Sequence, residues 1–388
     1  MVIDRRRGRY VPRIDRRKCR RCGMCVDVCP GPGLDFEDLN ASLFGDIPEE
    51  PILGKYLGVY IGHATDHKVR HDGASGGLVT ALLICALEEG LIDGALVTRM
   101  RADRPLEAEP FIARTRQDIM AAARSKYCPV PANVAVKTLL AEEGRFAVVG
   151  LPCHIQGIRL AEQRIEGLKE RVRYRISLTC SLNYSFRGTE HILKGLGIAP
   201  RSVRALEYRG RGWPGSMLIR TNDGTDTIVP LADYYGQLEP YSLGRCTLCS
   251  DLFGELSDLS CGDARTREAV RADKSGSSFA VTRTPEAEEL LERAAAQEAV
   301  CLSELALREL LASQTHAAFK KRKLESRMRL MRLAGKRVPH YCQKLSEPVE
   351  GDFLDSLRFY VRRLALGSGD GFLSQVFHVA TGLARKRE

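Results

Sequence analysis

Apolar positions recur with strand-like and helix-like periods over the first half of the chain. The β-branched and aromatic run YLGVYIGH at 56–63 is typical of a strand, and residues 77–89 carry apolar side chains at helical spacing before Gly90. GALVTRM at 94–100 predicts the next strand, so the glycine-rich loop at 73–77 enters a helix between two strands. Such a loop offers backbone N–H groups and a positive dipole end to an anion. Its glycines do not follow the dinucleotide-binding pattern, so a plain helix entry that needs small residues is the alternative.

Two further apolar runs end at cysteines. RFAVVG at 145–150 predicts a buried strand and continues into the helical pattern LPCHIQGIRLAEQ, which contains Cys153. RVRYRISLTCSLNYS repeats the arrangement with Cys180 at the strand end. Because α/β sheets carry their chemistry at strand ends that face a crevice, we expect an α/β (α+β) fold with a site between these cysteines.

The remaining pattern sets the expected domain organisation. Residues 286–334 read as helical, and two amphipathic pieces follow at 352–366 and 372–388. The longest apolar stretch, residues 78–87, is about half a membrane span. We predict four segments: a ferredoxin-type segment at 1–50, a domain with the glycine loop at 51–135, a domain with the later cysteines at 136–310, and a basic helical extension at 311–388.

The stretch KCRRCGMCVDVCP at 18–30 has the spacing of a ferredoxin cluster site. Its four thiols, Cys19, Cys22, Cys25 and Cys29, follow the pattern C-x2-C-x2-C-x3-C-P of [4Fe–4S] proteins. Zinc sites favour two separated CxxC pairs, and disulfides do not suit so tight a spacing. We predict a [4Fe–4S] cluster here. In two-cluster ferredoxins the last cysteine of such a run serves the other cluster, so the role of Cys29 stays open.

A second set of four thiols is spread over three loops. Cys153 and Cys180 follow strands, while Cys246 and Cys249 form a CxxC pair. Spacing alone leaves a second cluster, a zinc site and ordinary packing open. Cys85 and Cys301 are interpreted as packing residues.

Charge is concentrated in two stretches. The net charge is +10, of which residues 1–21 hold +8 and residues 316–340 another +8, leaving −6 for the remainder. Both stretches are expected to dock an acidic protein, an anionic cofactor or a membrane surface, with a solvated face as the alternative. Sparse aromatics argue against nucleic acid. The 13 cysteines and the absence of an N-terminal apolar run predict a reducing compartment, the cytoplasm.

Several of these stretches together resemble one known family. The carriers are DGASGGLVTALLICALEEGLIDGALV, SKYCPVPANV, GLPCHIQGIR, LTCSLNYS and RCTLCSDLFGELSDLSCGD, in this order. They resemble the beta-subunit family of coenzyme F420 (deazaflavin) hydrogenases and dehydrogenases over roughly residues 55–320. The ferredoxin segment is present in only some members, and the extension from about residue 335 matches none of the well-known ones.

The resemblance implies cofactors and site residues. Cysteines matching Cys153, Cys180, Cys246 and Cys249 hold a second [4Fe–4S] cluster beside FAD in the family. The regions that surround the flavin there match two stretches of this chain, which gives Asp72, Gly73, Ser75, Gly76, Gly77, Thr80, Ser125, Lys126, Tyr127 and Asn133 as candidate flavin-binding residues.

The expected function is a conversion between two-electron and one-electron transfer. FAD would exchange a hydride with a deazaflavin or another organic substrate, and the clusters would exchange single electrons with a ferredoxin or partner subunit. Alternatives are a flavin-free two-cluster protein and a ferredoxin-dependent reductase of an organic substrate. No catalytic residue is assigned. His154 and Asn183 could tune a cluster or donate a proton, and His63, His67 and His71 could form a metal site, although plain polar roles compete.

Overall fold

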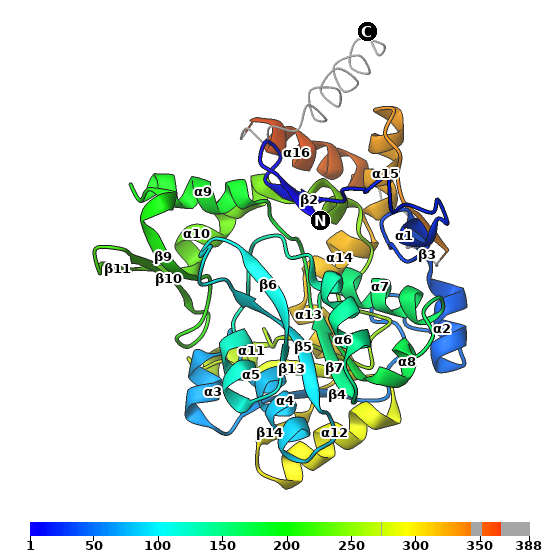
Figure 1. Cartoon of the computed structure of the whole chain (residues 1–388), viewed down its shortest axis with the longest axis vertical. Coiled ribbons are helices and arrows are strands. Elements are labelled where there is room, and N and C mark those ends of the chain that lie inside the picture. The colour runs from blue at the N-terminus through cyan, green and yellow to red at the C-terminus, as the bar shows by residue number, and fades with distance from the viewer. Residues whose placement is uncertain (273, 343–350, 366–388) are drawn as a thin grey trace.

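An eight-stranded mixed sheet forms the centre of the computed structural model, which describes residues 1–272, 274–342 and 351–365. Four neighbouring strands are parallel and the others antiparallel, which confirms the predicted α/β class (Figure 1). The strand order is β14 (Val300–Glu304), β4 (Val59–Ala64), β13 (Ser278–Thr282), β12 (Leu259–Asp263), β8 (Val172–Leu178), β7 (Phe146–Gly150), β5 (Gly94–Met100) and β6 (Ala108–Ala113).

Alternate residues of the parallel strands feed two separate apolar cores. Ala95 and Val97 of β5 face a core shared with α4 (Leu78–Glu88), α5 (Arg116–Ala122) and α12 (Pro285–Ala296). Leu96 faces the other core, with α6 (Val136–Ala141), α7 (Pro152–Glu162) and α8 (Leu168–Arg171). Because side chains alternate along a strand, both faces of the sheet are covered by apolar cores.

A smaller antiparallel sheet carries a tyrosine-rich core. It consists of β11 (Asp226–Pro230), β10 (Ser216–Thr221) and β9 (Val203–Glu207), and Figure 1 shows it to one side of the main sheet. Its core contains Tyr184, Tyr208 and Tyr234. The short elements of this region and of the connections are α3 (His67–Asp72), η1 (Ala132–Ala135), α9 (Phe186–Gly195), η2 (Pro200–Ser202), α10 (Leu231–Tyr234), η3 (Tyr235–Tyr241), η4 (Gly244–Leu248) and α11 (Arg267–Ala272).

The described N-terminal and C-terminal segments lie together at one end of the molecule (Figure 1). The N-terminal segment contains a hairpin of β1 (Val2–Asp4) and β2 (Arg9–Val11), then α1 (Met24–Asp27), β3 (Gly33–Asp35) and α2 (Phe36–Phe44). The C-terminal segment contains α13 (Leu307–Ser313), α14 (His316–Lys321), α15 (Leu324–Leu333), β15 (His340–Cys342) and α16 (Asp352–Ala365). β15 pairs in parallel with β3 and so joins the two segments.

Two sequence predictions need correction. Residues 286–334 are not helical throughout, because Val300–Glu304 forms the edge strand β14 on β4. The basic stretch 316–340 is not simply a surface, because Lys320, Lys321 and Arg327 are all buried.

Other expectations meet the structure differently. The sheet takes strands from both predicted central segments, so their division remains a prediction from sequence. The amphipathic piece at 372–388 lies outside the described residues. No helix in the described part of the chain is long and apolar enough to cross a membrane.

Candidate functional site

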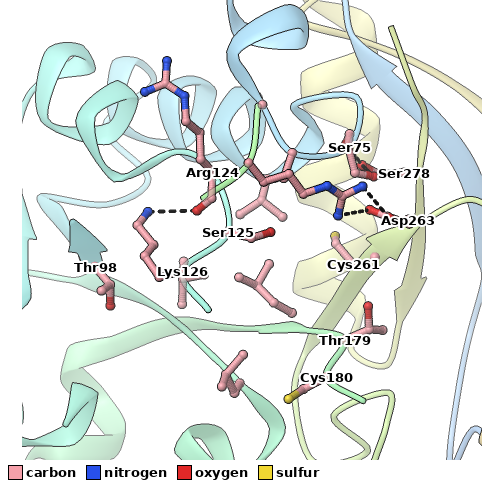
Figure 2. Close-up of a pocket in the computed structure, with 18 of the residues that line it drawn as sticks. Ser75, Thr98, Arg124, Ser125, Lys126, Thr179, Cys180, Cys261, Asp263 and Ser278 are labelled. Atoms are coloured by element: carbon pink, nitrogen blue, oxygen red, sulfur yellow. Dashed lines mark hydrogen bonds and ion pairs between the residues drawn. The ribbon is translucent and has the colours of Figure 1, made fainter. Parts of the chain in front are cut away.

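A cavity of about 310 Å³ lies where the parallel strands end. Thr98 of β5, Gly150 of β7, Leu178 of β8 and Gly262 of β12 all line it, as the rule for ligand crevices in α/β sheets predicts. Figure 2 shows the segment with Arg124, Ser125 and Lys126 facing Thr179, Cys180 and Cys261. Of the ten candidate flavin-binding residues, seven line the cavity: Gly73, Ser75, Gly77, Thr80, Ser125, Lys126 and Tyr127.

The N-terminus of α4 opens into this cavity. Gly77, the N-cap, has φ 72 and makes no capping hydrogen bond through a side chain. A Cβ on Gly77 would lie 2.5 Å from the carbonyl oxygen of Val69, so the turn requires glycine. The first helical residues, Leu78–Thr80, line the cavity with backbone N–H groups that no side chain caps. This end of the cavity therefore suits a phosphate group.

The opposite wall is basic. Lys126 Nζ donates to the backbone oxygens of Ala123 (2.7 Å) and Arg124 (2.9 Å), near the end of α5. Burial, with a further contribution from Arg124, lowers the pKa of Lys126 to about 7. Arg124 donates to the backbone oxygen of Asp72 at 3.1 Å and pairs with Glu207 at 3.2 Å.

A buried ion pair forms another wall of the cavity, beside Ser75 and Ser278. Arg209 and Asp263 lie 2.7 Å apart, and both line the cavity (Figure 2). Burial alone would raise the pKa of Asp263, but the Arg209 guanidinium outweighs it and the pKa is lowered. Ser75 and Ser278 share a hydrogen bond of 3.1 Å beside this pair.

Three candidate flavin residues do not line the cavity. Asp72 lies behind Arg124, within 3.7 Å of its guanidinium. Gly76 accepts a backbone hydrogen bond from Ala64. The Asn133 amide donates to the backbone oxygen of His154 at 2.9 Å, on the side of α7 that faces the N-terminal segment. Their assignment as flavin-binding residues stays a prediction from the family resemblance.

The second set of four thiols comes together beside the cavity. Cys153 lies in the first turn of α7, Cys180 follows β8, Cys246 lies in η4, and Cys249 follows η4. Cys153 and Cys180 are each close enough to Cys246 and Cys249 for the charges of their thiolates to interact. Cys153 as a whole residue is exposed to solvent, but protein atoms surround its thiol. This burial raises the pKa of the Cys153 thiol to about 12. Because iron binds the thiolate, loading this site must release protons.

The arrangement differs from a single-ion site. Within the described residues, no three His, Cys, Asp or Glu side chains are placed to hold one metal ion. A tetrahedral zinc ion needs all its thiolates about 2.3 Å away, whereas a [4Fe–4S] cube gives each thiolate its own iron. The same finding leaves His63, His67 and His71 without a shared metal site.

Cys180 belongs to both features, since it lines the cavity and is one of the four thiols. His154 also lines the cavity, but both ring nitrogens are used: Nδ1 accepts from the Leu151 N–H at 3.2 Å, and the ring bonds to the Val130 backbone. Burial lowers the pKa of His154 to about 4. His154 is thus a satisfied polar residue at a helix start.

The four N-terminal thiols form an exposed loop around α1. Cys19, Cys22, Cys25 and Cys29 are all exposed. Gly23 begins α1 with φ 78, and the Gly31 N–H donates to Cys29 Sγ at 3.4 Å. Arg245, the neighbour of Cys246 in the sequence, links this loop to the inner thiols. Its guanidinium donates to the backbone oxygen of Pro30 at 2.8 Å.

Family descriptions match most of the chain. Residues 59–137 match the N-terminal part and residues 143–307 the C-terminal part of "Coenzyme F420 hydrogenase/dehydrogenase, beta subunit". The chain belongs to this beta-subunit family. Residues 12–31 match a 4Fe–4S binding domain. The beta-subunit match therefore covers most of the residues that line the cavity and all four inner cysteines, and the 4Fe–4S match covers the four outer cysteines.

Individual relatives agree with this family. The chain is 28% identical over 250 residues to the coenzyme F420 hydrogenase subunit beta of Methanothermobacter thermautotrophicus, covering 63% of this chain and 83% of the relative. It is 25% identical to a coenzyme F420-dependent sulfite reductase of Methanocaldococcus jannaschii, covering 75% of this chain and 48% of that protein. A chain of the F420-reducing [NiFe] hydrogenase complex of Methanosarcina barkeri has the same fold, with a TM-score of 0.60, 24% identity, and coverage of 75% of this chain and 98% of that one.

The protein is accordingly an iron–sulfur electron-transfer oxidoreductase of this family. Sequence reasoning missed Arg209, Asp263, Arg245 and Lys320, which the fold brings to the cavity or the thiols. Arg245 and Asp263 are the first and last residues of a stretch that carries the resemblance, but Arg209 and Lys320 had no local signal.

Proposed function

We propose that the protein exchanges a hydride with a small organic substrate through FAD, and passes electrons singly through two [4Fe–4S] clusters to a protein partner. The observation that carries this proposal is the double position of Cys180, in the wall of the cavity and among the inner four thiols. A cofactor in the cavity would thus touch a ligand of the inner cluster. A reduced deazaflavin is the substrate that the names of the relatives favour.

The residues of the cavity fit a flavin nucleotide. The uncapped N–H groups of α4 and the hydroxyl of Thr80 suit the phosphates. Leu78, Val149 and Leu182 offer apolar surface for a planar ring, and the cavity volume of about 310 Å³ is within the usual range for ligand pockets. A bound flavin supplies the chemistry, because it takes up electrons in pairs and releases them singly.

The protein's own residues hold these parts in place. The ion pair of Arg209 with Asp263 fixes one wall of the cavity, and the hydrogen bonds of Lys126 to the end of α5 fix another. Both ring nitrogens of His154 bond to backbone, which keeps the first turn of α7, with Cys153, against the cavity. Arg245 then links the inner thiols to the loop of the outer thiols.

The partner is proposed to be a ferredoxin or another redox subunit that docks over the outer thiols. Arg16, Arg17, Arg20 and Arg21 are exposed around them, and so are the apolar side chains of Met24 and Val26, at 43% and 57%. A basic surface with an apolar centre suits an acidic protein.

The test is the cofactor content of protein purified and reconstituted without oxygen. We expect flavin absorption bands, one FAD released on denaturation, and about eight iron and eight sulfide per chain from two cubes. About four of each would remove one cluster, and iron without flavin would leave a two-cluster electron carrier. Bleaching of the flavin by reduced coenzyme F420, compared with NADH and NADPH, then identifies the hydride donor.

A further inference from the structure

Lys320 is a buried cation beside the inner thiols. It lies on α14 and is only 2% exposed. Its ammonium donates to the backbone oxygen of Cys246 at 3.4 Å, and Cys249, Cys180 and Cys246 are all close enough to interact with its charge. Residue 320 lies beyond the part of the chain that matches the family, which ends at 307.

No carboxylate balances this charge. In the described residues Lys320 forms no ion pair, whereas its neighbour Lys321, equally buried, lies 2.6 Å from Glu255. A buried ammonium without a negative partner is costly, and neutral thiols do not offset that cost. Four thiolates around an iron–sulfur core would offset it, because their total charge is negative in both oxidation states and more so after reduction.

Two other cations, Arg245 and Arg327, also lie near enough to interact with the thiol charges, but their hydrogen bonds go to residues outside the set. Arg245 donates to the backbone oxygens of Pro30 and Leu248. Arg327 donates to those of Thr247 and Phe319. Among the described cations near the thiols, Lys320 is the one whose ammonium bonds to the backbone of a cysteine of the set.

We propose that Lys320 is a fixed counter-charge of the inner cluster, which raises the cluster's reduction potential by favouring the reduced, more negative state. This inference rests on the inner cluster of the proposed function. Reduction adds one electron to the cluster, forms and breaks no bond, and leaves the proton on Lys320. Charge and hydrogen bonds near the sulfurs are established means of setting such potentials.

The test is a redox titration of the reconstituted full-length protein, followed by the electron paramagnetic resonance of each reduced cluster. Lys320→Met should lower the reduction potential of the inner cluster by at least about 59 mV, which is a tenfold change in the equilibrium constant of a one-electron reduction. Lys320→Arg keeps the charge and should stay near the wild-type value. Arg322→Met removes an exposed charge two residues away and should leave both clusters unchanged. The outer cluster serves as the internal reference in every variant.

An unchanged inner potential in Lys320→Met would overturn the inference. Loss of the inner cluster in Lys320→Met but not in Lys320→Arg would support it, because the charge would then be what the cluster needs. Loss in both variants would make Lys320 a packing residue and overturn it. A wild-type protein with only the outer cluster would instead refute the proposed function, which the iron content shows separately.

Discussion

Of the four inner thiols, Cys180 is the one that also lines the cavity, and its replacement tests the inner ligand set. We expect Cys180→Ser to lose the inner cluster and about half of the bound iron, because a cube that lacks one of four thiolates is poorly held. The outer cluster should remain, since its thiols lie in a separate exposed loop. Iron analysis and electron paramagnetic resonance measure both effects.

The control for Cys180 is another buried cysteine that contacts neither site. Cys85 lies in the core on α4, and Cys85→Ala should keep both clusters with some loss of stability. Full iron content in Cys180→Ser, or half content in Cys85→Ala, would show that the inner ligand set is wrong.

The ion pair of Arg209 and Asp263 is a second feature at the residue scale, and we expect it to contribute to the free energy of unfolding. Arg209→Met removes the buried partner of the Asp263 carboxylate and leaves only the half-exposed Arg265, 3.3 Å away, so it should cost up to about 3–5 kcal/mol at neutral pH. The pKa of Asp263 is lowered in the folded protein, so the pair stabilises fully above the unfolded value of about 3.9 and less as pH falls through the folded value. The difference between variant and wild type should therefore shrink towards acid pH.

Urea unfolding in a pH series from about pH 7 to well below the unfolded value of about 3.9 measures this difference. The matched control is Arg293→Gln, which breaks an equally short but half-exposed pair with Glu289 and should cost about 0–1 kcal/mol. Equal costs for the two variants would mean that burial adds nothing to the Arg209 pair.

At the scale of elements, the strands and helices around the cavity could be predicted and the edge strand could not. β5 and β7 are continuous apolar runs, because both faces of the sheet are covered there. β14 has mostly exposed side chains, and it becomes a strand only through its pairing with β4, more than 230 residues earlier by sequence. No local pattern carries that contact.

The same division applies to the candidate site. Thiol spacing predicted the outer set directly, since its ligands lie within one loop. The family resemblance, rather than spacing, selected the inner set. Lys320 belonged to a stretch read as a charged surface, and only the packing of α14 against η4 places it inside. Charged residues that become buried through tertiary contacts leave no periodic signal in the sequence.

Three elements meet at Arg245, and this contact should hold the outer loop in place. Its guanidinium bonds to the backbone of Pro30 and lies 5.8 Å from the ring of Tyr341 on β15, the strand that pairs with β3. Hydrogen bonds from charged groups contribute about 1.5–3 kcal/mol. Arg245→Gln should thus speed hydrogen exchange in residues 24–35 by about tenfold or more.

Arg164 offers the comparison for Arg245. It also reaches the outer loop, through a 3.9 Å pair with Asp27, but both side chains are largely exposed. Arg164→Gln should change exchange in residues 24–35 by less than Arg245→Gln, because exposed pairs contribute about 0–1 kcal/mol. Similar effects of the two variants would rule out a special role for Arg245.

Across the whole molecule, the inner thiols connect the cavity, which Cys180 lines, with the loop of the outer thiols, which Arg245 contacts at Pro30. Figure 1 shows the N-terminal segment at one end of the molecule. That segment holds much of the positive charge of the chain, and residues 12–27 of it are exposed throughout. An arrangement of this kind exposes the outer cluster to a protein partner while the cavity stays deeper. The charge of +8 on residues 1–21 thus lies where a partner would approach.

The last prediction concerns this basic tip. Replacing Arg16, Arg17, Arg20 and Arg21 with Gln should slow electron exchange with an acidic ferredoxin on the order of tenfold at low salt, because charge steers association. The effect should fade at high salt, where the Debye length falls to about 3 Å at 1 M. A small neutral dye should react at the wild-type rate.

The count-matched control replaces four exposed cations on α3, α11 and α12, which Figure 1 shows at the other end of the molecule: Lys68, Arg267, Arg271 and Arg293. Stopped-flow measurement of the electron-exchange rate across a salt series distinguishes the outcomes. Equal slowing in both variants would mean that only the net charge matters. No slowing in either variant would mean that the basic tip is a solvated surface without a docking role.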